Sequence, residues 1–158
     1  MEDFPAAPYD TTSKVITGFV VLLTGFFVVL SFTGRLPPYA MALMPVILTV
    51  TWGFSIRGYT VEPGILVVNR PFLGKTIRLE GDLVAEHDPA WGKGAVKVAG
   101  NGGLFGYYGT FRSVRLGQFS AYATTLKNGV VIRAGGKTFV VTPEEPGMFL
   151  TRLTESVC

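Results

Sequence analysis

The sequence is poor in the residues that most often bind metals or form disulfides. Its 158 residues include one cysteine, Cys158, and one histidine, His87. A single cysteine excludes an intrachain disulfide framework and a cysteine-based zinc site, and a single histidine excludes a metal site built from several histidines. We therefore expect neither a bound metal nor another cofactor.

Charged residues are also few, whereas apolar residues are abundant. Charged side chains make up 16% of the chain, against roughly 25% in a typical soluble protein, and 48% of the residues are hydrophobic. This composition argues against a disordered chain and against a simple soluble monomer, and the length leaves little room for a large enzyme. The net charge of only +3, without a basic stripe, argues against a nucleic-acid partner.

Two long apolar segments near the N-terminus account for much of the apolar excess. Residues 15–32 and residues 39–56 each contain eighteen positions without a charged side chain. Eighteen residues span about 27 Å as a helix, close to the roughly 30 Å hydrocarbon core of a bilayer. Tyr39 and Trp52 lie towards the two ends of the second segment, as interfacial aromatic residues do. The sequence therefore predicts a transmembrane helical hairpin over residues 15–56.

Two alternatives to this hairpin fit less well. A secretory signal peptide is a poor match, because acidic residues precede the first segment and the apolar run is too long. A buried hairpin in the core of a soluble fold would need more covering protein than the rest of the chain supplies.

Lysine and arginine residues near the helix ends predict the orientation of the hairpin. The loop between the two segments holds one such residue, Arg35. The segment after the second helix holds four: Arg57, Arg70, Lys75 and Arg78. By the positive-inside rule, both chain termini then lie in the cytoplasm. We expect residues 1–14 to be an N-terminal cytoplasmic tail and residues 57–158 to be a cytoplasmic domain of a multi-pass protein in the cytoplasmic (inner) membrane.

The predicted domain has the pattern of an antiparallel β fold followed by one helix. Short apolar runs between turn residues predict about seven strands, at residues 59–61, 65–68, 75–79, 83–86, 117–124, 130–133 and 138–141. The turn Ala-Gly-Gly-Lys at residues 134–137 predicts a hairpin between the last two. Residues 88–108 are rich in glycine and are expected to form loops. Thr142 and Glu145 predict a capping box at the start of the C-terminal helix.

Three stretches carry a resemblance to a known family. The run Gly-Asn-Gly-Gly-Leu-Phe-Gly-Tyr-Tyr-Gly at residues 100–109 is followed by Ala-Tyr-Ala-Thr at residues 121–124, and then by Val-Val-Thr-Pro and a short helix at residues 140–153. These stretches resemble those of the bacterial PH-domain membrane proteins, in which a two-helix hairpin often precedes the domain. The resemblance implies a membrane-anchored α+β protein whose PH-like seven-stranded β-barrel or sandwich is capped by a C-terminal helix. It implies little about function, because PH-like domains have many roles.

The sequence contains no convincing catalytic motif. The segment Ala-Gly-Gly-Lys-Thr at residues 134–138 ends like a P-loop, but Val131 stands where the first glycine is needed. Glu86, His87 and Asp88 follow one another along a predicted strand end, so that adjacent side chains point to opposite faces and do not converge on a metal. Any Ser-His-Asp triad would depend on the single histidine. We therefore predict that the protein is not an enzyme.

Three sets of residues are candidates for binding. One set crowds into the glycine-rich segment, where it either fills the end of the barrel or forms a partner-binding loop: Leu104, Phe105, Tyr107, Tyr108 and Phe111. Gly18 and Gly25 lie near one face of the first helix and allow close helix packing in the membrane. Arg70, Lys75 and Arg78 suit the phosphate of a lipid headgroup, or simply make a membrane-facing surface basic.

These candidates support two interpretations of function. The preferred one is a non-catalytic interaction module, tethered to the bilayer, that serves as an accessory, scaffold or assembly subunit of a larger membrane complex or as a homo-oligomer. Confinement to the membrane raises the effective concentration of its partners. The alternative is a tethered module that senses anionic lipid headgroups.

Overall fold

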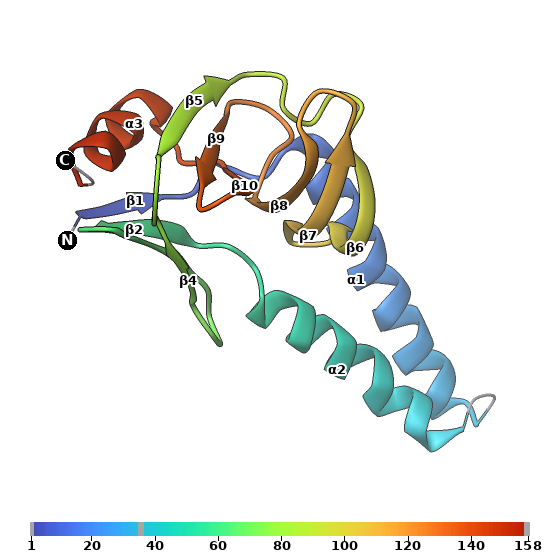
Figure 1. Ribbon diagram of the computed structural model, residues 1–158. Coiled ribbons are helices and arrows are strands. Elements are labelled where there is room, and N and C mark those ends of the chain that lie inside the picture. Colours follow the sequence, from blue (N-terminus) through green and yellow to red (C-terminus); the bar gives the residue numbers. More distant parts are fainter. Residues whose placement is uncertain (1, 35–36, 157–158) are drawn as a thin grey trace.

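A helical hairpin projects from a domain built of two β-sheets and a C-terminal helix in the computed structural model, which describes residues 2–34 and 37–156 (Figure 1). The helices are α1 (Thr11–Phe32), α2 (Pro38–Gly53) and α3 (Pro146–Glu155). The first sheet has the strand order β1-β2-β3-β4, with β1 (Glu2–Pro5), β2 (Gly58–Glu62), β3 (Ile65–Asn69) and β4 (Lys75–Arg78).

The second sheet has six strands in the order β5-β9-β10-β8-β7-β6. They are β5 (Val84–Asp88), β6 (Val96–Gly103), β7 (Gly106–Ser113), β8 (Gly117–Ala123), β9 (Gly129–Ala134) and β10 (Lys137–Val141). Neighbouring strands are antiparallel except β8 and β10, which are parallel. The predicted hairpin at residues 134–137 is confirmed as the turn between β9 and β10.

Two hydrophobic cores lie on opposite faces of the six-stranded sheet. The first core fills the space between the two sheets and α3, which contributes Phe149 and Leu153. The second core lies on the other face, where Trp91 covers β7, β8 and β10. Strand β8 alternates between the two cores, because Ala121 and its alternate neighbours enter the second core while Tyr122 packs against the first. The domain is thus a PH-like β-sandwich with a C-terminal helix.

The residues predicted as an N-terminal tail belong largely to this sandwich. Strand β1 pairs antiparallel with β2, and Phe4 is buried with its ring centroid 5.3 Å from that of Phe149. Asp10 then caps α1 by accepting a hydrogen bond from the Ser13 N–H at 2.7 Å. The prediction missed β1 because its four residues carry a single large apolar side chain, too short a pattern to indicate a strand.

The two apolar helices lie side by side and leave much of their apolar surface exposed. In α1, Phe19, Leu22 and Phe32 are 65%, 76% and 74% exposed. Of the helices in the described residues, only α1, with 22 residues, is long and apolar enough to cross a membrane. Helix α2 has 16 residues and ends at Gly53, three residues earlier than predicted, because Ile56 already packs into the first core.

The glycine-rich segment is a strand pair rather than the predicted loop. Together with β1, this pair gives the described residues ten strands instead of about seven. Gly100 lies opposite Gly109 in the register of β6 and β7, and both have positive φ angles, of 108° and 126°. A Cβ atom on either glycine would collide with the backbone of the other strand. Glycine therefore permits this close strand pairing, although it usually indicates a break in a strand.

The start of α3 also differs from the prediction. The helix begins at Pro146, and within the described residues no side chain caps its N-terminus. The hydroxyl oxygen of Thr142 instead accepts a hydrogen bond from the Thr124 N–H at 2.9 Å. Thr142 is fully buried in the sandwich, so it is not available as the first residue of a capping box.

A basic groove between the two sheets

A groove of about 600 Å³ lies where the edge strand β4 faces the second sheet. Its lining includes three basic side chains, Lys75 and Arg78 from β4 and Lys137 from the start of β10. Glu80 also lines the groove, and its carboxylate Oε1 lies 3.7 Å from Nη1 of Arg78. Both side chains are largely exposed. Such an exposed pair is weak, so the groove keeps a positive potential.

Arg70 lies next to this groove in a cluster of aromatic rings. Its guanidinium carbon is 5.2 Å from the ring centroid of Tyr122, 5.7 Å from that of Tyr108 and 6.0 Å from that of Phe54. Tyr122 also lines the groove, so the cluster and the groove share a wall. Cation–π attraction of about 0.5–1 kcal/mol per ring holds the guanidinium in place.

The positive charge of Arg70 is not neutralised by an acidic side chain in the described part of the chain. Arg70 forms no ion pair there, and its buried Nε has no hydrogen-bond partner among the described residues. Burial lowers the pKa of Arg70, and the neighbouring tyrosines, Tyr122 first, partly oppose this shift. An arginine nevertheless stays protonated in proteins, so the cluster carries a full positive charge.

Comparison with known families identifies the domain that holds this groove. A family model described as the bacterial PH domain matches residues 57–157. The chain belongs to the bacterial PH domain family. The matched residues include β2 to β10 and α3, whereas β1 and the helical hairpin lie outside the match. Comparisons with curated proteins and with solved structures find no match.

Membership in this family suggests a non-catalytic interaction module. The predicted resemblance is thereby confirmed for the PH domain itself. The basic groove is consistent with a binding role. Among the described residues, no group of three or more His, Cys, Asp and Glu side chains could hold a metal ion.

The PH domain brings two of the three predicted phosphate-binding residues into one site. Lys75 and Arg78 line the groove together, while Arg70 lies behind Tyr122. The sequence analysis missed Lys137, which follows a hairpin turn and carries no binding motif. Its place beside β4 results from the packing of one sheet against the other, and no local pattern could have predicted it.

For two of the five aromatic and apolar residues of the glycine-rich segment, the structure matches the alternative in which they fill the barrel. Tyr107 and Phe111 are buried in the second core, so they are not available to a partner. Tyr108 is half-buried in the Arg70 cluster. Leu104 and Phe105, at the turn between β6 and β7, are half-buried, and their role as a contact surface stays a prediction.

The turn between β6 and β7 is attached to the first turns of α1. The Ser13 hydroxyl donates to the Gly103 carbonyl at 2.7 Å and accepts from the Gly106 N–H at 3.2 Å. The Phe105 N–H donates to the Thr17 hydroxyl at 3.0 Å. Tyr107 donates to the Asp10 carboxylate, and burial, followed by the charge of that carboxylate, raises the pKa of Tyr107.

Gly18 and Gly25 do not take part in packing within the chain. Both are exposed on α1, and a Cβ atom at either position would have no described atom within 4 Å. The predicted close helix packing would therefore involve a helix of another molecule, and it stays a prediction.

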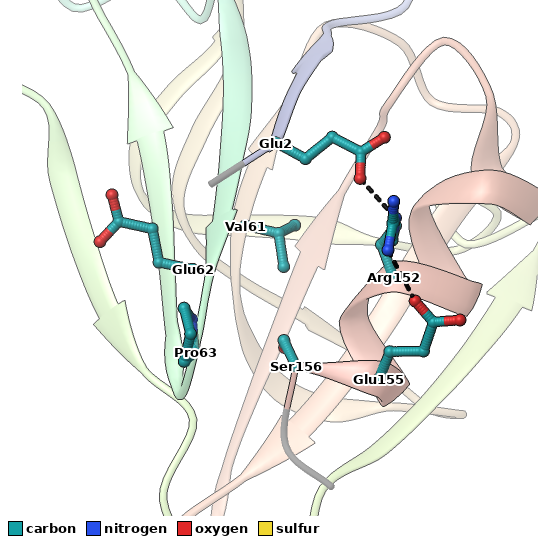
Figure 2. A pocket seen from close by; sticks show the side chains of 7 residues that line it. All are labelled: Glu2, Val61, Glu62, Pro63, Arg152, Glu155 and Ser156. Carbon is teal, nitrogen blue, oxygen red and sulfur yellow. Dashed lines mark hydrogen bonds and ion pairs between the residues drawn. The ribbon is translucent and has the colours of Figure 1, made fainter.

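A second, smaller pocket of about 250 Å³ lies where β1 and β2 meet α3. Figure 2 shows Arg152 between Glu2 and Glu155, while Glu62 points away from them. Nη1 of Arg152 donates a hydrogen bond to Oε2 of Glu155 at 2.9 Å. This hydrogen bond, followed by the charge of Glu2, raises the pKa of Arg152. Because the arginine is already matched by two carboxylates, this pocket links β1 to α3 rather than offering a free charge.

Proposed function

We propose that the chain is a membrane-anchored, non-catalytic PH module that binds the phosphate of anionic lipid headgroups. The observation that carries the proposal is the convergence of Lys75, Arg78 and Lys137 on one groove of about 600 Å³, next to Arg70. Phosphate oxygens suit arginine and lysine donors. The groove thus favours the lipid-sensing interpretation over the protein-interaction loop, which has lost two aromatic residues to the core.

The anchor in this proposal is the hairpin of α1 and α2, inserted from the cytoplasmic side of the inner membrane. The exposed apolar surface of both helices supports this anchor, because soluble monomeric proteins rarely expose apolar patches of that size. With 16 residues, α2 is about 24 Å long, somewhat shorter than the hydrocarbon core. Local thinning of the bilayer can accommodate such a difference at modest cost.

Thermal unfolding of the full chain in a neutral detergent tests the groove. A water-soluble, short-chain phosphatidylglycerol should raise the midpoint, because a ligand that binds only the folded state stabilises it. The matching phosphatidylcholine should not. A third arm with glycerol phosphate separates recognition of the lipid from recognition of free phosphate.

Paired variants assign the effect to the groove. Lys75→Ala and Lys137→Ala should each reduce the shift caused by phosphatidylglycerol, whereas Lys93→Ala, an exposed lysine outside the groove, should leave it unchanged. Equal shifts with both lipids, or an equal loss in all three variants, would show that the groove does not bind the headgroup.

A second candidate function, an accessory subunit of a membrane complex, is supported by an apolar patch far from the groove. Val96, Val98 and Val114 are 67%, 60% and 107% exposed, and they line a hollow of about 540 Å³ along β6. On its outer side β6 has no strand neighbour among the described residues, and such an edge can pair with another chain.

The native mass of the protein, extracted in mild detergent with co-purifying chains identified, tests this second function. A large particle that contains other subunits, and that Val98→Lys disperses, would support it. Val84→Lys, on the opposite edge strand β5, is the matched control. A particle with only this chain, unchanged by Val98→Lys, would contradict it.

A further inference from the structure

The loop between β3 and β4 presents two apolar side chains beside the membrane hairpin. Phe72 and Leu73 are 51% and 69% exposed. The Phe72 N–H donates to the Gly53 carbonyl at the end of α2 at 3.0 Å, and the ring centroids of Phe72 and Trp52 are 6.2 Å apart. In Figure 1 the hairpin that carries β4 points towards the same side of the domain as α2. The loop therefore lies where α2 enters the domain.

The length of the free part of α1 requires the domain to lie close to the bilayer. Because Ser13 and Thr17 are bonded to the turn between β6 and β7, only residues 18–32 of α1 project beyond the domain. These residues span about 22 Å, against roughly 30 Å for the hydrocarbon core. Full insertion of the hairpin therefore brings the surface around Gly53 and Phe72 down to the headgroups.

Basic residues surround the apolar pair. The guanidinium carbon of Arg57 lies 5.5 Å from the ring centroid of Trp52, and Arg57 is exposed. Lys75 follows the loop directly and is also exposed. Apolar and aromatic side chains flanked by lysine and arginine suit the boundary between acyl chains and anionic headgroups.

We propose that residues 71–74 form a second membrane contact, in which Phe72 and Leu73 insert into the headgroup–acyl boundary beside α2. This contact rests on the proposed insertion of the hairpin. Since Lys75 both follows the loop and lines the basic groove, the contact also places the mouth of the groove at headgroup level. The loop thus fixes the orientation of the domain on the lipid surface that it binds.

Depth-dependent fluorescence quenching of the full chain tests this contact. Cys158 is replaced with serine, and Leu73→Cys is labelled with an environment-sensitive fluorophore after reconstitution into vesicles of phosphatidylcholine and phosphatidylglycerol. A label at position 73 should shift its emission to shorter wavelength and lose most of its intensity to lipids that carry a nitroxide near the headgroup. Because Leu73 is largely exposed, the substitution leaves the cores intact.

Two matched positions make every outcome decisive. Phe26→Cys, exposed on α1, reports insertion of the hairpin with lipids that carry the nitroxide deep in the acyl chain, because position 26 lies midway along the free part of α1. Val114→Cys, exposed on the far part of the domain, should be quenched by neither kind of lipid. Quenching at positions 73 and 26 but not at 114 supports the contact. Quenching at 26 alone overturns the contact and keeps the anchor. Quenching at 73 alone overturns the anchor and, with it, a contact made beside an inserted α2. Quenching at neither position overturns both, and quenching at 114 as strong as at 73 overturns the contact.

Discussion

At the scale of single residues, the cation of Arg70 is held by aromatic rings and pairs with no carboxylate among the described residues. Its three ring neighbours lie 5.2–6.0 Å from the guanidinium carbon, and burial of an unneutralised charge costs stability. Such a cost is tolerated when the charge is needed for binding. Arg70 therefore connects the stability of the free domain to the occupancy of the groove.

Replacing this arginine separates the two effects. Arg70→Met keeps the length of the side chain and removes the charge, so we expect an unchanged or higher unfolding midpoint without ligand and a smaller shift with short-chain phosphatidylglycerol. Thermal unfolding with and without the lipid measures both quantities. Arg70→Lys, which keeps the charge, should retain more of the shift. A large fall in the midpoint of Arg70→Met would show instead that the arginine is mainly structural.

Tyr59 holds the two sheets together through its hydroxyl group. The side chain is fully buried, and the hydroxyl donates to the Tyr122 carbonyl at 2.6 Å and accepts from the Thr142 N–H at 3.0 Å. Tyr59→Phe should lower the free energy of unfolding by about 1–3 kcal/mol, because it leaves buried backbone groups unpaired. Denaturant unfolding measures the change, and Tyr39→Phe, exposed on α2, should have no effect.

The same side chain predicts a loss of stability at alkaline pH. Burial, opposed only in part by the hydrogen bonds with Thr142, raises the pKa of Tyr59 from 10.0 to about 12. The folded state then holds the phenol proton more tightly than the unfolded state, so this stabilisation is present below about pH 10 and is lost as the pH rises towards about pH 12.

Unfolding free energies of the protein and of Tyr59→Phe, measured across this range, should therefore converge. The difference should shrink by up to about 3 kcal/mol, since one unit of pKa corresponds to about 1.4 kcal/mol. A difference that stays constant from neutral pH to about pH 12 would contradict the assignment.

At the scale of elements, the glycines of β6 and β7 allow a strand pair that other residues would break. Gly109→Ala places a Cβ atom against the Ala99 carbonyl and at a φ angle of 126°, so it should lower the unfolding free energy by at least about 1–3 kcal/mol. Gly147→Ala, in α3 with open space around it, is the control and should be neutral or slightly stabilising. Equal effects of the two substitutions would contradict the close strand approach.

The parallel pairing of β8 with β10 is the element-scale feature that builds the groove. It places the start of β10, and with it Lys137, in the sheet that faces β4. The hairpin of β9 and β10 is predictable from its Gly-Gly turn, because a two-residue loop is a local signal. The pairing of β10 with β8 is a contact between segments that are distant along the chain, so no local sequence pattern predicts it.

At the scale of the whole molecule, the helical hairpin is an insertion within the sandwich rather than an extension before it. Strand β1 precedes the hairpin and β2 follows it, yet the two strands pair. Both ends of the hairpin are also attached to the domain, by Ser13 at α1 and by Gly53 at α2. The domain therefore moves together with the hairpin whenever the hairpin tilts.

This arrangement predicts that the PH domain does not fold well from the family-matched residues alone. Residues 57–158 lack β1, so β2 loses one of its two strand neighbours and becomes an edge strand, and Phe149 loses the ring of Phe4. We expect this fragment to be largely insoluble or to unfold at a clearly lower temperature than a fusion that joins residues 1–17 to residues 54–158 through a flexible linker. Soluble yield and circular dichroism melting compare the two, and equal melting would show that β1 is dispensable.

Elements whose signals are local could be predicted from the amino-acid sequence. Hydrophobic length predicted the two apolar helices, short apolar runs predicted seven of the strands, and the Gly-Gly turn predicted the hairpin after β9, because each of these patterns depends on neighbours within a few residues. The glycine-rich run identified the family but was misjudged as a loop, since its strand pairing depends on the approach of two backbones.

Contacts between distant segments follow from the packing of the folded chain. This packing paired β1 with β2 across the inserted hairpin, buried Tyr107 and Phe111, and brought Lys137 to the groove of Lys75 and Arg78. These outcomes depend on the packing of one sheet against another, and residues far apart in the chain carry no local pattern that encodes it.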